Sequence, residues 1–206
     1  MKNYIDKAMT FDEYVGLIER LLAERKTTGT NQSEAMFGYA KLNRQRMDRL
    51  AKTVDITQGV RLGANTVDRR QVWLIITEGW CGDAAQNIPV IEKIAAESDN
   101  IETRYLLRDE NPELMDRFLT DGARSIPKLI AVDAETYEVL GTWGPRPEPA
   151  QQLFLEMKER GLEKPLILEN MQRWYNADKT LSLQAEFEVL LKEWSSNKAS
   201  FVKATA

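Results

Sequence analysis

The chain has 206 residues, of which 43% are hydrophobic and 29% charged, the profile of a globular protein long enough to bury a sizeable core. Its net charge is −4 and its basic residues are scattered among acidic ones, so we expect no nucleic-acid partner. The absence of histidine excludes Ser-His-Asp and Cys-His catalysis and His-ligated metal sites. A single cysteine, Cys81, excludes an internal disulfide and multi-cysteine metal cages, and we expect neither a metal nor another cofactor.

The sequence carries no pattern of a membrane segment or a secretory leader. No apolar run approaches the roughly 20 residues that a membrane-spanning helix needs. The N-terminal residues 1–6 lack the apolar block of a signal peptide. We therefore expect a cytoplasmic protein without a membrane partner.

Residues 1–55 are predicted to form two helices that pack on the rest of the chain. Thr10 and Glu13 have the spacing of a capping box, and an apolar stripe at helical spacing follows them. A second helix is predicted over about residues 33–53. Its most basic stretch, residues 44–49, is interpreted as the solvated face of that helix.

Residues 56–161 are predicted to form one domain in which strands and helices alternate. The segment 54–70 contains Gly59 and Gly63 and is interpreted as a loop with one short strand. Residues 72–77 form a continuous apolar and β-branched run, which is typical of a central strand buried on both faces. Further elements are predicted in chain order as strands at 101–107, 126–132 and 137–143 and a helix over 147–160.

Residues 162–206 are predicted to be a C-terminal helical extension. Its clearest element is a helix from Leu181 to Trp194 with an apolar stripe on one face. The last ten residues are expected to be frayed. The stripe and the N-terminal helices leave two alternatives open, since they can pack on the domain's own faces or join two copies into a homodimer.

The stretch Trp80-Cys81-Gly82-Asp83-Ala84 follows the buried strand and resembles the Trp-Cys-Gly-Pro-Cys site of thioredoxins. Pro89, Asp109-Glu110-Asn111-Pro112 and Ile126-Pro127 also stand at the spacing of thioredoxin motifs, the last being the family's Ile-Pro motif with a cis proline. The resemblance covers about residues 70–160. It implies an α/β, thioredoxin-like fold with a mixed central sheet flanked by helices, here with N-terminal and C-terminal helical extensions.

Three departures from the thioredoxin pattern bear on activity. Ala84 stands in place of the resolving cysteine, and a methyl group cannot attack a mixed disulfide. Asp83 replaces the usual proline, and its negative charge would disfavour a thiolate at Cys81 if the carboxylate points at the sulfur. Ile75 occupies the position where thioredoxins bury a carboxylate. Dithiol disulfide reduction is therefore not expected.

The pattern retains Cys81 at the start of a helix, where unpaired amides favour a negative charge and can lower the pKa of a thiol. We therefore expect a monothiol oxidoreductase. Cys81 would attack the disulfide of a protein or of a small thiol, and an external thiol would resolve the mixed disulfide. The resemblance implies substrate contacts from Trp80, Gly82, Asp83, Ile126 and Pro127.

Two other hypotheses remain open. A redox-inactive binding module would hold a protein or peptide segment in the groove around Trp80, Ile126 and Pro127, with Cys81 kept as a small packed side chain. A redox sensor would join two chains through a Cys81–Cys81 disulfide. Replacing Cys81 by serine separates binding from exchange, because only the covalent chemistry requires the sulfur.

Overall fold

The computed structural model describes residues 1–195, and its N-terminal part is helical. It contains α1 (Lys2–Ile5), α2 (Phe11–Ala23) and α3 (Glu34–Thr53). The predicted capping box is confirmed, because Thr10 Oγ1 accepts the Glu13 N–H at 3.3 Å and Glu13 Oε2 accepts the Thr10 N–H at 2.8 Å. The predicted second helix is also confirmed, with the side chain of Ser33 as its cap.

The prediction of a loop over residues 54–70 is wrong in its middle, where residues Gln58–Ala64 form α4. The two glycines that suggested a loop allow close packing instead. A Cβ on Gly59 would lie 2.0 Å from Glu188 Oε2, and a Cβ on Gly63 would lie 3.3 Å from Leu191 Cδ1. These glycines therefore let α4 approach the last helix, α9 (Leu181–Trp194).

The centre of the protein is a mixed sheet of four strands in the order β2-β1-β3-β4. Strand β1 pairs in parallel with β2 and antiparallel with β3, which pairs antiparallel with β4. The strand bounds are β1 (Gln71–Thr77), β2 (Ile101–Leu107), β3 (Lys128–Asp133) and β4 (Val139–Trp143). All seven residues of β1 are buried, as the apolar run predicted. Strand β3 begins two residues later than predicted, after Pro127, whose nitrogen has no hydrogen to donate to a ladder.

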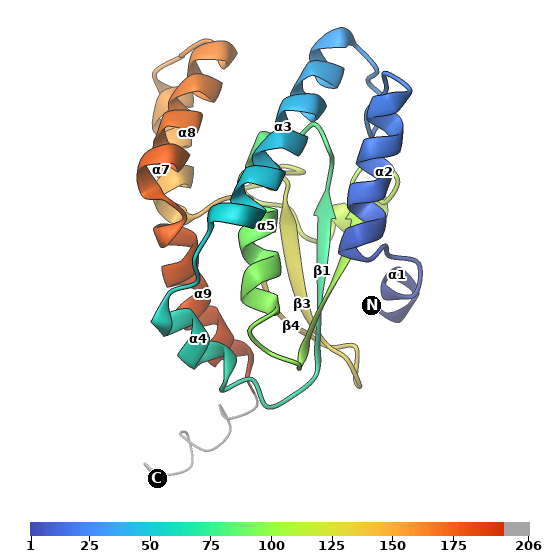
Figure 1. Ribbon diagram of the computed structural model, residues 1–206, viewed down its shortest axis with the longest axis vertical. Coiled ribbons are helices and arrows are strands. Elements are labelled where there is room, and N and C mark those ends of the chain that lie inside the picture. The colour runs from blue at the N-terminus through green and yellow to red at the C-terminus, as the bar shows by residue number, and fades with distance from the viewer. Residues whose placement is uncertain (196–206) are drawn as a thin grey trace.

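Helices flank this sheet (Figure 1), as the thioredoxin resemblance implies. The remaining ones are α5 (Gly82–Ala95), α6 (Pro112–Met115), α7 (Glu148–Glu159) and α8 (Lys164–Asp178). In Figure 1, α3 crosses in front of α5, α1 and α2 lie at one side, and α4, α7, α8 and α9 lie at the other. The sequence predicted α7 and α9 but not α8.

The apolar stripe of α9 packs into the chain's own core. The Phe187 ring centroid lies 5.4 Å from those of Trp73 in β1 and Trp143 in β4, and Trp194 meets Trp73 edge-on at 5.8 Å. Helix α8 is different, because it shares with α7 a small separate apolar cluster of Ala150, Met157, Ile167 and Met171. The buried apolar side chains of α8 therefore belong to this cluster and not to the main core.

Within residues 1–195, no helix is both long enough and apolar enough to cross a membrane. The fraying expected for the last ten residues concerns positions outside the described part of the chain.

Candidate functional site

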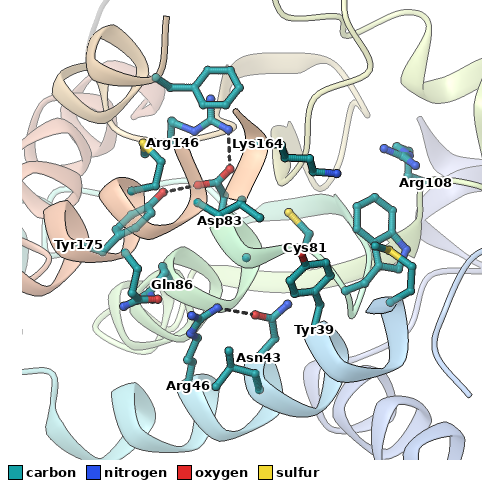
Figure 2. Close-up of a pocket in the computed structure, with 18 of the residues that line it drawn as sticks. Tyr39, Asn43, Arg46, Cys81, Asp83, Gln86, Arg108, Arg146, Lys164 and Tyr175 are labelled. Carbon is teal, nitrogen blue, oxygen red and sulfur yellow. Dashed lines mark hydrogen bonds and ion pairs between the residues drawn. The ribbon is translucent and has the colours of Figure 1, made fainter. Parts of the chain in front are cut away.

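A cavity of about 520 Å³ opens over the start of α5. Its floor is the predicted motif Trp80, Cys81, Gly82 and Asp83. One wall is α3 and the opposite wall is α8, with residues of the loop after β4 and of α7 beside it. Figure 2 shows Cys81 between these walls, with Tyr39, Asn43 and Arg46 on the α3 side. The two helical walls and the motif therefore enclose a recess at the start of α5.

Cys81 is the residue that caps α5. Its Sγ accepts the Ala84 N–H at 3.5 Å, and its thiol donates to the carbonyl oxygen of Ile126 at 3.3 Å. The Ile126–Pro127 peptide bond is cis. Cys81 is only 8% exposed, yet it belongs to the cavity lining. The thiol is thus a hydrogen-bonded part of the cavity floor.

The electrostatics of Cys81 differ from the sequence-based expectation. Burial and, to a lesser extent, the negative charge of Asp83 raise the pKa of the Cys81 thiol to about 12, although the amides of Ala84 and Asp83 and the charge of Arg146 act in the opposite direction. The expected effect of the helix start is present, but desolvation outweighs it. The expectation of a lowered thiol pKa is therefore wrong.

Asp83 is fully engaged by neighbours from the C-terminal part of the chain. Arg146 Nη2 donates to its Oδ2 at 2.5 Å and Tyr175 Oη donates to its Oδ1 at 2.8 Å, as Figure 2 shows. The Arg146 and Asp83 side chains are only 10% and 17% exposed. Burial and the Asp83 charge raise the pKa of Tyr175, so this phenol stays a donor. The Asp83 carboxylate thus ties the first turn of α5 to α8.

The structure separates the six predicted site residues into two groups. Trp80, Cys81, Gly82 and Asp83 line the cavity, and the Arg108 guanidinium lies 4.8 Å from the centre of a Trp80 ring. Ile126 and Pro127 are buried behind Cys81 and are not part of the cavity lining. Ile126 and Pro127 therefore do not contribute to the lining of this cavity.

Sequence reasoning missed the cavity walls. On α3, Tyr39, Leu42 and Arg46 line the cavity, although residues 44–49 were interpreted as a solvated face. Their spacing of three and four residues places them along one side of a helix, a signal that the sequence contains. On α8, Lys164 and Leu168 line the opposite side. Their role follows only from where α8 packs.

A buried carboxylate, Glu78, was also missed. It is 0% exposed, its Oε1 accepts the Asp109 N–H at 3.0 Å, and its Oε2 has no hydrogen-bond partner in the described part of the chain. Burial raises the pKa of Glu78, and the nearby charge of Asp109 acts in the same direction. The family pattern directed attention to position 75, whereas this chain buries its carboxylate three residues before Cys81.

A family model described as thioredoxin matches residues 29–159 of the chain. Among solved structures, an HIV epitope-scaffold is similar with 16% identity and a TM-score of 0.59, covering 93% of this chain and 96% of that one. A protein of unknown function from Pseudomonas aeruginosa is similar with 17% identity and a TM-score of 0.58, covering 92% and 95%. These similarities confirm the expected thioredoxin-like fold. No curated protein sequence matches the chain.

Proposed function

This chain belongs to the thioredoxin family, and we propose that it acts as a binding protein that holds a ligand non-covalently in the cavity over Cys81. One observation carries the proposal: α3 and α8 enclose the family motif in a recess of about 520 Å³ whose floor is a buried, hydrogen-bonded thiol. Such a recess has the size of a small-molecule site.

The state of Cys81 supports binding over exchange. Because burial and the charge of Asp83 raise its pKa to about 12, the Cys81 thiol is almost entirely neutral at pH 7. Exchange requires the thiolate, so its rate falls with the ionised fraction. The hydrogen bond from the thiol to the Ile126 carbonyl also uses the neutral form, because a thiolate has no hydrogen to donate.

The surroundings of Cys81 support the same conclusion. Ala84, at the position of a resolving cysteine, only presents its N–H to the sulfur. The buried positions of Ile126 and Pro127 move the binding surface from the expected peptide groove to the cavity itself. The occupant is therefore a small molecule or a single inserted side chain of a partner.

Monothiol exchange is the second candidate, and the contact of Cys81 with the cavity favours it. In that reaction the Cys81 thiolate attacks a disulfide sulfur, releases one thiol and forms a mixed disulfide. An external thiol then attacks the partner's sulfur, forms a new disulfide and releases Cys81 as a thiolate. A small disulfide that enters the cavity meets the sulfur directly.

Alkylation of the folded protein by iodoacetamide over a pH series, read by intact mass, tests the two candidates. The binding proposal expects slow alkylation whose rate keeps rising beyond pH 9, with the protein unfolded in urea reacting as an ordinary thiol. The opposite result is rapid alkylation with an apparent pKa below 8.5, together with a small-thiol adduct that is absent in Cys81→Ser. That result would overturn the binding proposal and favour monothiol exchange.

A further inference from the structure

The charged residues of the cavity are unequally paired. Four cationic and two anionic side chains line it, and two of the cations have carboxylate partners: Arg146 binds Asp83 at 2.5 Å, and Arg108 binds Asp109 at 2.8 Å. Among the described residues, neither Arg46 on α3 nor Lys164 on α8 has a carboxylate within salt-bridge distance. The cavity therefore carries an excess of two positive charges.

Arg46 is held in the wall without a counter-charge. Its Nη1 donates to Asn43 Oδ1 at 3.0 Å and lies 4.0 Å from the point that a Cβ on Gly82 would occupy, next to the first turn of α5. Partial burial lowers the pKa of Arg46, and the neighbouring charge of Arg49 adds to this effect. A guanidinium has five N–H donors, and one of them has a hydrogen-bond partner in residues 1–195.

The opposite wall supplies the second cation. Lys164 begins α8, and Figure 2 shows Lys164 and Arg46 on opposite sides of Cys81. Lys164 is exposed and its ammonium group sits on a flexible stem, so it can reach towards a bound group. The two cations thus come from the two helices that flank the motif.

Apolar side chains with large exposed surfaces meet in the same recess. Tyr39, Leu42 and Leu168 are 37%, 43% and 40% exposed, and all three line the cavity. Apolar side chains gathered in one recess mark a binding site more often than the same residues scattered over a surface. A ligand that covers them must carry an apolar body.

From this combination we propose that the ligand is a small amphipathic organic anion. Its apolar body lies against Tyr39, Leu42 and Leu168, and its anionic head lies between Arg46 and Lys164. The inference rests on the proposed binding function and adds the chemical class of the ligand. A planar guanidinium favours a carboxylate head, because it can donate two parallel hydrogen bonds to it.

Calorimetric titration with three matched probes tests the charge requirement. The probes are 4-phenylbutyrate, 4-phenylbutanol and 4-phenylbutylamine, which share one apolar body and differ in the charge of the head. We expect the acid to bind most tightly, the alcohol more weakly and the amine most weakly. The acid's advantage over the alcohol should shrink as salt is added.

Charge-removing variants locate the head. Arg46→Gln and Lys164→Gln should each weaken binding of 4-phenylbutyrate about tenfold, the size expected for one charge-assisted hydrogen bond, and leave the alcohol unaffected. Lys41→Gln, which removes an exposed charge of α3 outside the cavity lining, is the matched control and should change nothing. Lys164 is exposed, so its variant tests the inference even if Arg46→Gln folds poorly.

The outcomes of these experiments distinguish failure of the anion inference from failure of the proposed binding function. Equal binding of acid and alcohol, unaffected by the two variants, would overturn the anion inference and keep the binding cavity. If none of the three probes binds and none slows the alkylation of Cys81, both the anion inference and the proposed binding function are overturned. Tight, variant-sensitive binding of the acid that also protects Cys81 from iodoacetamide supports both together.

Discussion

Helices α8 and α9 belong to the same C-terminal extension but differ in how they pack on the rest of the protein. Helix α9 buries Leu183, Phe187, Leu191 and Trp194 in the main core, whereas α8 buries only Ile167 and Met171, in the small cluster shared with α7. Helix α9 meets an apolar sheet, and α8 meets the polar start of α5. The facing surface therefore decides whether a helix added to this fold supplies stability or a cavity wall.

The largest effect should come from α9. Phe187 is 0% exposed and its ring contacts Trp73 and Trp143, so Phe187→Ala leaves a cavity and should lower the free energy of unfolding by about 3–5 kcal/mol. Urea denaturation measures it. Val189→Ala, on the exposed side of the same helix, should change stability by less than about 0.5 kcal/mol. A loss below about 1 kcal/mol at Phe187 would contradict the division of roles.

The buried ion pair between Asp83 in α5 and Arg146 in the loop before α7 should give the next effect. Asp83→Asn leaves Arg146 as a nearly buried charge without its counter-ion and should cost about 3 kcal/mol. Asp116→Asn breaks a pair with Arg124 of similar length, 2.6 Å, but those side chains are 50% and 52% exposed, so it should cost less than about 1 kcal/mol. Equal costs from the two variants in urea would show that burial does not set the difference.

The same Asp83 variant tests the electrostatics of the cavity floor. The Asp83 charge raises the pKa of Cys81, so its removal should lower that pKa and speed alkylation at a given pH, while Asp116→Asn should not. Burial remains the larger cause, so the thiol should still titrate above the ordinary range. A rise in the Cys81 pKa in Asp83→Asn would contradict this assignment.

The buried Glu78 predicts a pH-dependent effect. Its pKa is raised in the folded state, so ionising it favours unfolding: its stabilising contribution is complete in acid and is lost as the pH rises through the raised pKa. Glu78→Gln removes this dependence and should unfold at higher urea than wild type at neutral pH, with the difference vanishing in acid. Glu110→Gln, at an exposed position, is the control. If the stability advantage of Glu78→Gln over wild type instead grows as the pH falls, the predicted direction of the pH dependence is wrong.

The smallest effects should come from the exposed apolar residues of α8. Leu168→Ala should change the free energy of unfolding by less than about 0.5 kcal/mol, because the side chain is 40% exposed. It should nevertheless weaken binding of 4-phenylbutyrate roughly three- to tenfold through lost apolar contact. Leu166→Ala, on the same helix but outside the cavity lining, should leave binding unchanged. If Leu168→Ala and Leu166→Ala change the affinity for 4-phenylbutyrate equally, the ligand does not bind against Leu168.

The elements that the sequence predicted correctly depend on local signals. The capping box of α2 is set by Thr10 and Glu13 alone, and β1 is set by an uninterrupted apolar run. Helix α4 was missed because Gly59 and Gly63 signal a loop locally, and only the approach of α9 explains them. The apolar residues of α8 are divided between a small cluster and the cavity. They therefore do not form the single apolar stripe from which an amphipathic helix is predicted.

The candidate site divides in the same way. Trp80, Cys81, Gly82 and Asp83 lie together in the cavity lining, because adjacent residues at the start of a helix stay together. The charge state of Cys81 could not be inferred, because the burial that raises its pKa depends on the rest of the fold. Arg46 and Lys164 are 118 positions apart in the sequence, and only tertiary packing brings both to the lining of one cavity.

One short segment restricts how copies of this protein can assemble. Strand β2 lies at the edge of the sheet, and at its middle Tyr105 exchanges backbone hydrogen bonds of 2.8 and 2.9 Å with Met9. These bonds use the amide and carbonyl that an incoming strand would need at that point. Two copies therefore cannot merge into one continuous sheet across β2 unless the segment before α2 first peels away.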